Sequence, residues 1–279
     1  MIFHFAPRAY VAGMIKALTL AALLALPALH APAATQDDVL SATILPGWRT
    51  GAGSHMAALH LSLAPSWKTY WRSPGEAGIP PMFNWSGSDN LASVKIHWPR
   101  PTVFHLNGMQ TIGYLTDLVL PLEITAIDPD KPIRLRATVD LGVCKDVCMP
   151  AALTLSADLQ APGAPDAAIK AALNARPETG DEAGLTQISC QVDPISDGLR
   201  VTATILMPAT GGTETVVLEP GQEAVWVSEA QSTREGRSLT ATADFVPTSG
   251  APFALDRSAM MVTVLGADRA VEILGCPSD

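Results

Sequence analysis

Hydrophobic and polar residues alternate along much of this chain. Between residues 133 and 141 the apolar side chains share one side of an extended chain, and Arg, Thr and Asp occupy the other. This period of two predicts a strand with one buried face. The same reasoning predicts strands at 56–63, 118–124, 153–159, 199–206, 215–218, 224–227, 238–245, 260–265 and 270–274. Turn residues separate these short segments, so we predict an all-β protein built from antiparallel β-sandwiches.

A change of pattern divides the chain into two such regions. Residues 166–175 (DAAIKAALNA) have Ala, Ile and Leu at helical spacing and are followed by Pro177. Since proline ends helices, we predict a short connecting helix here. The expected organisation is a first sandwich over 36–162, a linker with the helix over 163–182 and a second sandwich over 183–279.

The first 33 residues have the features of a secretory signal peptide. Arg8 and Lys16 precede the short apolar segment ALTLAALLAL, and Ala31-Pro32-Ala33 provides a small-x-small cleavage pattern. No later segment has 18 consecutive apolar residues, so we predict a mature chain without a transmembrane segment. Export would place the protein in an oxidising compartment such as a periplasm, where disulfides persist.

The charge balance of the chain is acidic. There are 18 Lys and Arg against 27 Asp and Glu, which gives a formal net charge of −9. Proteins that bind nucleic acid neutralise phosphates with Lys and Arg. We therefore expect no nucleic acid among the partners.

Two of the four cysteines, Cys144 and Cys148, lie four positions apart at the end of a predicted strand. Residues four apart in a strand are about 13 Å distant, whereas a disulfide joins Cα atoms about 4.4–6.8 Å apart. The chain must therefore turn sharply for the pair to bond. A disulfide that closes so small a loop gains little from loop entropy, and an easily reduced disulfide favours redox activity over a structural role.

Two alternatives stay open for this pair. A small structural disulfide also fits the spacing. Thiolates and thioethers suit Cu(I) as well, although no His or Met stands at regular ligand spacing with the cysteines. We predict no cofactor and no resident metal, with Cu(I) binding as the alternative.

The other two cysteines, Cys190 and Cys276, lie at the edges of the strands predicted for the second sandwich. A bridge between them would tie the ends of that domain, worth roughly 4–5 kcal/mol in the chain-entropy model. We predict a structural disulfide rather than a second redox pair, because neither cysteine has a partner in a tight loop.

Three aromatic residues in the first region, Trp67, Tyr70 and Trp71, precede a loop rich in Pro and Gly. One interpretation places them in the sandwich core. The other makes them an aromatic wall that keeps water away from the cysteines. Alternation puts Trp67 and Trp71 on one face, so part of this cluster is expected in the core.

A third segment, PTVFHLNGMQTIGY at 101–114, has no clear periodicity. It carries Phe104, Leu106 and Met109 around the Asn-Gly turn signal at 107–108. It is either a plain hairpin loop or an apolar cap that folds over the cysteines.

Three separated motifs carry a resemblance to a known family. WKTYWRSPGEAGIPP, FHLNGMQTIGY followed by LVLPLEI, and VDLGVCKDVCMPAALTL occur in the order and spacing of that family. The chain resembles the N-terminal periplasmic domain of the DsbD thiol–disulfide interchange proteins, and within it the ScsB-like branch, over about residues 36–160. That branch also carries a second β-domain, which would account for residues 183–279.

The resemblance implies an immunoglobulin-like β-sandwich that exchanges electrons with thioredoxin-like periplasmic oxidoreductases. It implies that Cys144 and Cys148 are the redox pair, with Cys148 the attacking thiol. It also assigns Phe104 to Met109, including His105 and Leu106, to the cap. The family's membrane and C-terminal thioredoxin-like domains are missing from the sequence, so we expect a separate membrane electron-transfer protein as a partner.

The groups that would tune the thiols are left open by the sequence. Lys145 would favour a thiolate electrostatically. Because residues 103–113 contain no carboxylate, any proton handling is expected from Asp140, Asp146 or His105.

Overall fold

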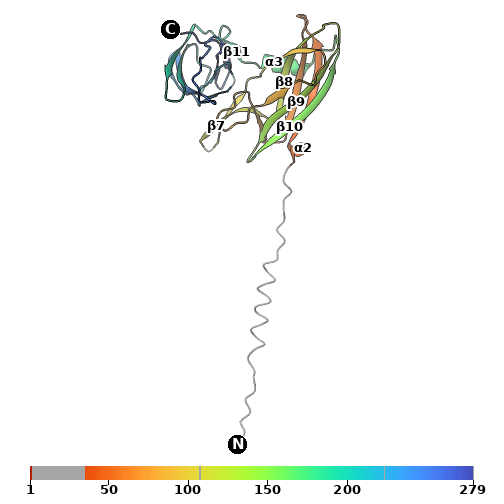
Figure 1. Ribbon diagram of the computed structural model, residues 1–279, viewed down its shortest axis with the longest axis horizontal. Helices are drawn as coiled ribbons and strands as arrows, with labels where there is room; N and C mark the ends of the chain where they lie inside the picture. The colour runs from red at the N-terminus through yellow and green to blue at the C-terminus, as the bar shows by residue number, and fades with distance from the viewer. Residues whose placement is uncertain (2–34, 107, 223, 279) are drawn as a thin grey trace. The chain divides into compact units, whose positions relative to one another are not determined.

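The computed structural model describes Met1 and residues 35–106, 108–222 and 224–278. The chain is all-β, with two antiparallel β-sandwiches of immunoglobulin-like type and a short helix between them (Figure 1). The predicted signal peptide, apart from Met1, lies outside the described residues. Residues from Gln36 onward form one compact unit, and the expected domain boundaries within it stay predictions.

The first sandwich consists of two sheets. One has the strand order β1-β2-β8-β5, and the other has the order β10-β9-β3-β7-β6 with β4 added alongside β9. All pairings within both sheets are antiparallel. The strands are β1 Leu40–Arg49, β2 His55–Leu63, β3 Lys68–Tyr70, β4 Met82–Asn84, β5 Leu91–Ile96, β6 Thr102–Leu106, β7 Met109–Leu115, β8 Asp117–Ala126, β9 Ile133–Cys144 and β10 Cys148–Leu159.

The alternation seen in the sequence explains the packing of β9. Its apolar residues from Ile133 to Val139 are buried, and the charged residues between them are exposed. The buried face joins one hydrophobic core with residues of β2 and β8, among them Leu59 and Leu122. Burying each such side chain contributes about 1.5–3 kcal/mol, so the core holds β9 and the turn that follows it in a fixed register.

The second sandwich also has two sheets. Their strand orders are β11-β19-β18-β14 and β12-β13-β17-β15, with β16 alongside β17. All pairings are antiparallel except the short parallel pair of β11 and β19. The strands are β11 Glu178–Thr179, β12 Gln187–Pro194, β13 Leu199–Leu206, β14 Thr215–Glu219, β15 Val225–Val227, β16 Gln231–Glu235, β17 Ser238–Pro247, β18 Met261–Leu265 and β19 Ala270–Leu274.

The predicted connecting helix is confirmed as α3, Ala167–Asn174. Asp166 caps it, since its carboxylate accepts hydrogen bonds from the backbone N–H groups of Ala168 and Ile169. Ile169 is buried against Met56 of the first sandwich. The other described helix is the single turn α2, Gln36–Val39.

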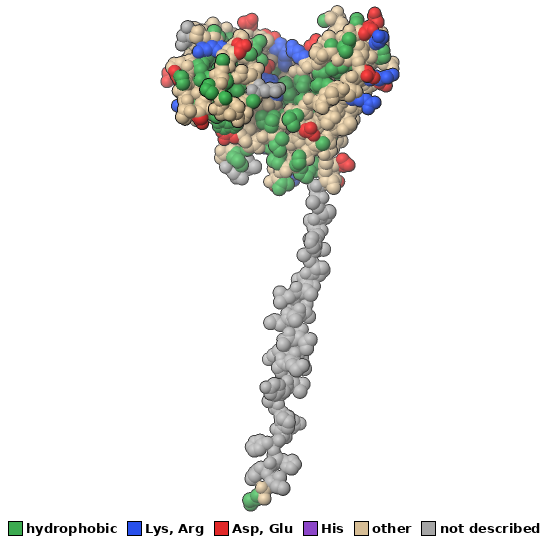
Figure 2. Space-filling view, in the orientation of Figure 1, with side chains coloured by type: hydrophobic (Ala, Val, Ile, Leu, Met, Phe, Trp, Pro, Cys, Tyr) green, Lys and Arg blue, Asp and Glu red, His purple; other side chains and the backbone are tan. Residues whose placement is uncertain are grey.

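The surface mixes charges of both signs. On the face drawn in Figure 2, acidic and basic side chains are interspersed among hydrophobic and neutral ones. Within the described part of the chain, no helix is long and apolar enough to cross a membrane.

Candidate functional site

The β9–β10 hairpin brings Cys144 and Cys148 together. The two residues are paired directly across the strands, and their sulfurs form a disulfide with the Cα atoms 4.1 Å apart. A hydrogen bond from the Lys145 N–H to the Val147 carbonyl, 3.1 Å long, closes the turn between them. The sharp turn that the spacing demands is therefore present.

The two cysteines differ in exposure. Cys144 ends the buried part of β9 and is 1% exposed, whereas Cys148 is exposed. Val147, next to Cys148 in the turn, is 67% exposed. A reagent or partner from solvent therefore meets the Cys148 side of the disulfide first.

Tyr70 of β3 supplies the polar contact to the disulfide. Its hydroxyl donates a 3.0 Å hydrogen bond to Sγ of Cys144 and lies 3.4 Å from Sγ of Cys148. Burial raises the pKa of Tyr70, so the phenol keeps its proton at neutral pH. It therefore remains a hydrogen-bond donor throughout that range.

Gly142 makes room for this contact. A Cβ at position 142 would lie 3.1 Å from the Tyr70 ring and 2.9 Å from Cβ of Ile79. Because a larger residue on β9 would push both side chains away, glycine allows Tyr70 to lie over the strand beside Cys144. The neighbouring Thr69 hydroxyl donates to the Gly142 carbonyl at 3.0 Å and fixes β3 to β9.

A lysine lies near the ring of Tyr70. Lys68 pairs with Cys144 across β3 and β9, and its Nζ donates to the Thr111 hydroxyl at 2.7 Å. The same Nζ is 5.7 Å from the Tyr70 ring centroid and 5.0 Å from that of Phe104. Burial lowers the pKa of Lys68. Sequence reasoning chose Lys145 as the basic neighbour and missed Lys68, whose only signal was its place two residues before Tyr70.

The expected cap segment is the hairpin of β6 and β7. Phe104 is half-buried and faces Lys68, whereas Met109 is 55% exposed at the hairpin end. The Leu106 side chain lies outside the described part. In the described contacts, Phe104 packs near Lys68, Lys68 lies near Tyr70, and Tyr70 contacts the disulfide.

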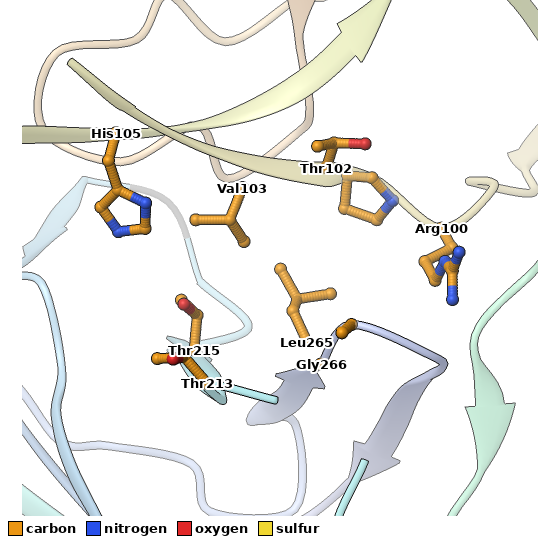
Figure 3. Close-up of a pocket in the computed structure, with 10 residues that line it drawn as sticks. Arg100, Thr102, Val103, His105, Thr213, Thr215, Leu265 and Gly266 are labelled. Atoms are coloured by element: carbon orange, nitrogen blue, oxygen red, sulfur yellow. The ribbon is translucent and has the colours of Figure 1, made fainter. Parts of the chain in front are cut away.

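His105, by contrast, points away from the cysteines. It lines a cavity of about 340 Å³ together with Val103, Thr213 and Thr215 (Figure 3). Since side chains alternate across a strand, His105 occupies the face of β6 opposite Phe104. The structure therefore does not support its expected role in proton handling at the sulfurs.

The carboxylates and the lysine singled out from the sequence are all exposed. Asp140 lies on the same face of β9 as Cys144, but Gly142 and the loop residue Ile79 come between them. Asp146 and Lys145 are in the turn. Among the described contacts, none of these three side chains touches a sulfur.

The aromatic residues divide between the two interpretations. Trp71 is fully buried in the core of the first sandwich, and Trp67 packs against that core. Of the three, Tyr70 alone contacts the sulfurs in the described part of the molecule. Of the expected aromatic wall, only Tyr70 lies at the sulfurs in the described residues, and the two tryptophans belong to the core.

Cys190 and Cys276 form the second disulfide, with Cα atoms 5.4 Å apart. Both are fully buried in the hydrophobic core of the second sandwich. Cys190 lies in β12 and Cys276 follows β19, and the Cys190 N–H donates to the Pro277 carbonyl at 2.7 Å. The disulfide thus joins the two sheets of that sandwich.

In the described residues, no three or more His, Cys, Asp or Glu side chains gather in a group that could hold a metal ion. Both candidate thiol ligands are in the disulfide. The Cu(I) alternative therefore stays an untested prediction about the reduced protein.

The comparisons with known proteins agree with this geometry. Residues 41–159 match the family described as thiol:disulfide interchange protein DsbD, N-terminal. A search of the curated proteins found no match. Among solved structures, the chain is similar to the N-terminal periplasmic domain of ScsB from Proteus mirabilis, with 25% identity and a TM-score of 0.64, over 89% of this chain and 97% of that one. Residues 41–159, which contain the Cys144–Cys148 hairpin, are therefore a DsbD N-terminal-like domain.

Proposed function

We propose that this chain is a thiol–disulfide exchange protein that passes reducing equivalents between thioredoxin-like proteins through Cys144 and Cys148. The observation that carries the proposal is the Tyr70 hydroxyl within hydrogen-bond distance of both sulfurs, beside one buried and one exposed cysteine. A structural disulfide needs no such donor, whereas a disulfide that opens must stabilise a thiolate.

The first half of the reaction reduces this protein. A thiolate of a reduced partner attacks Sγ of Cys148, the bond between the two sulfurs breaks, and Cys144 leaves as a thiolate. The Tyr70 hydroxyl donates to that thiolate, and the ammonium of Lys68, 5.7 Å from the Tyr70 ring centroid, adds positive potential. The partner's second thiol then attacks its own sulfur in the mixed disulfide, which releases Cys148. The partner leaves oxidised, and this chain holds both electrons.

The second half reverses the roles. The Cys148 thiolate attacks the disulfide of a downstream protein, and Cys144 resolves the mixed disulfide by attacking Cys148. The disulfide forms again and the downstream protein leaves as a dithiol. In this scheme Cys148 is the exchanging cysteine because it is exposed, and Cys144 is the resolving cysteine because it is buried beside Tyr70.

The compartment and partners follow from the same chemistry. Disulfides persist in exported, oxidising compartments, which agrees with the predicted signal peptide. The similar ScsB domain is periplasmic by its description. We infer a periplasmic protein that acts as a protein-disulfide reductase component, with thioredoxin-like oxidoreductases as partners and a membrane electron-transfer protein as the source of electrons.

The test is the trapping of a mixed disulfide. Reduced Cys144→Ser protein, mixed with an oxidised thioredoxin-like protein, should accumulate a covalent complex through Cys148, because the resolving thiol is missing. Cys148→Ser should give little complex under the same conditions. Equal trapping by both variants, or by neither, would contradict the proposal. Stoichiometric Cu(I) retention by the reduced wild type, lost in the Cys144→Ser/Cys148→Ser variant, would instead favour the copper alternative.

A further inference from the structure

A cluster of three charged side chains joins the two sandwiches next to the site. Nε and Nη2 of Arg72 donate to the two carboxylate oxygens of Glu219 at 2.9 and 2.8 Å, and Nη2 also donates to Glu272. The three side chains are only 23%, 19% and 29% exposed. A bidentate pair that is mostly shielded from water is stronger and more directional than an exposed one.

Arg72 is only two residues beyond Tyr70. Between them, Trp71 is fully buried, and its backbone N–H donates to the Ile112 carbonyl of β7 at 3.0 Å. The guanidinium of Arg72 lies 4.4 Å from the Trp71 ring centroid. The segment from Tyr70 to Arg72 is therefore held both by β7 and by carboxylates of the second sandwich. These contacts restrict the movement of Tyr70.

The second sandwich also touches the hairpin that carries Phe104. The Thr215 hydroxyl donates to Oε1 of Gln110 at 3.4 Å. Thr213 and Thr215 face Val103 and His105 across the cavity of Figure 3. The segment that follows β3 and the β6–β7 hairpin that pairs with β3 are thus both in contact with the second sandwich.

We propose that Arg72 is a positioning residue, and that through its ion pairs with Glu219 and Glu272 the second sandwich holds the Tyr70 hydroxyl against the sulfurs. The second sandwich then sets the reactivity of a thiol pair that it does not itself contain. This inference rests on the proposed function for its biological meaning, since it assigns a control of the same cysteines.

The experiment measures the pH dependence of alkylation of the reduced Cys144/Cys148 pair by iodoacetamide, with the Cys190–Cys276 disulfide left intact. Glu219→Gln, Glu272→Gln and the double variant lie in the second sandwich, and Arg72→Gln tests the other partner. Loss of a hydrogen bond to a thiolate raises its pKa, so alkylation at pH 7 should slow about 3- to 10-fold. Circular dichroism and thermal unfolding check the fold, and the carboxylate variants answer the question if Arg72→Gln does not fold.

A matched control lies in the second sandwich itself. Arg200 and Asp244 form an exposed bidentate pair at 2.7 and 2.8 Å, so Arg200→Gln and Asp244→Asn remove a similar interaction away from Arg72. Both should keep the wild-type alkylation profile. An unchanged profile in the Glu219→Gln/Glu272→Gln protein, or the same change in the controls, would overturn the inference.

A double-mutant cycle separates positioning from general stability. In a Tyr70→Phe background, the two Gln substitutions should slow alkylation no further, since the group that they position is gone. An equal slowing in both backgrounds would mean that Arg72 does not act through Tyr70. Alkylation needs no partner protein, so it tests the role of Arg72 even if the protein does not exchange disulfides with thioredoxin-like proteins. In the same way, an unchanged alkylation profile would not contradict the proposed exchange function.

Discussion

The hydroxyl of Tyr70 lies 3.0 Å from Sγ of Cys144, although 74 positions separate the two residues in the chain. The contact exists because β3 pairs with β9 and because Gly142 leaves space for the ring. It connects an aromatic residue of one motif with a cysteine of another. The chemistry proposed for this protein depends on that connection.

Replacement of Tyr70 by Phe should slow reduction of the Cys144–Cys148 disulfide by dithiothreitol about 10- to 100-fold. Phe keeps the packing but removes the donor to the leaving Cys144 thiolate, and a hydrogen bond to a charged group is worth about 1.5–3 kcal/mol. Stopped-flow or quenched reduction kinetics would measure the rate. Tyr114→Phe is the control, because Tyr114 is also buried but donates to the Pro99 carbonyl; an equal slowing in that variant would contradict the role of Tyr70.

The two disulfides should differ in reduction potential, with Cys144–Cys148 the more oxidising. In the chain-entropy model a disulfide stabilises the folded state by restricting the unfolded chain. The effect is small for the four-position loop of Cys144–Cys148 and roughly 4–5 kcal/mol for the 86-position loop of Cys190–Cys276, so reduction of the second pair loses more folding free energy. Equilibration with glutathione buffers, followed by mass spectrometry of alkylated peptides, would give both values. Equal potentials would mean that the assigned roles are wrong.

Removal of the second disulfide should affect stability and spare exchange. Cys190→Ala with Cys276→Ala should lower the free energy of unfolding by about 2–5 kcal/mol, because the bond joins the two sheets of the second sandwich in its core. Urea denaturation would measure this change. Thiol exchange at Cys148 should survive; a stable variant without exchange would reverse the assignment of the two pairs.

Loss of the apolar residues of the hairpin should open the site to small thiols. Replacement of Phe104, Leu106 and Met109 by Ser should speed reduction by dithiothreitol and help much less with a thioredoxin-like partner that binds the hairpin. Phe104→Ser alone should account for most of the effect, because Phe104 is half-buried against Lys68 while Met109 is largely exposed. His105→Ser, on the opposite face of β6, is the control. An unchanged dithiothreitol rate in a folded triple variant would exclude a cap.

The stability of the first sandwich should fall below about pH 6.5 through His55. His55 is 2% exposed, and its Nε2 donates to the Pro46 carbonyl at 2.6 Å. Burial lowers the pKa of His55. The hydrogen bond to Pro46 raises this pKa and the charge of Arg49 lowers it, and the net shift is downward. The folded state therefore prefers the neutral ring. The stabilisation that the neutral ring contributes is complete above the pKa of His55 in the unfolded state, and it is lost as the pH falls below that pKa. His55→Gln should flatten the decline in thermal midpoint between pH 7 and 5.

Much of this protein could be predicted from local patterns. The period-two alternation predicted β9, β10 and most strands of the second sandwich, and β9, β13 and β17 show the buried face that it implies. The four-residue spacing of Cys144 and Cys148 at the end of a predicted strand predicted a tight turn, since an extended strand would hold the two residues about 13 Å apart. The family motifs added the immunoglobulin-like sandwich. Strands β3 and β4 have three residues each, which is too few to show a period, and they were not predicted.

The environment of the disulfide was decided by tertiary structure alone. Strand order and register determine that Tyr70, rather than Trp71, contacts the sulfurs and that Lys68 lies near the Tyr70 ring. The alternation of β6 turns Phe104 toward Lys68 and His105 into a different cavity. Arg72 meets Glu219 and Glu272 across 147 and 200 positions. A sequence records which residue types are present, but contacts over such separations depend on how whole sheets pack, and no local pattern encodes that packing.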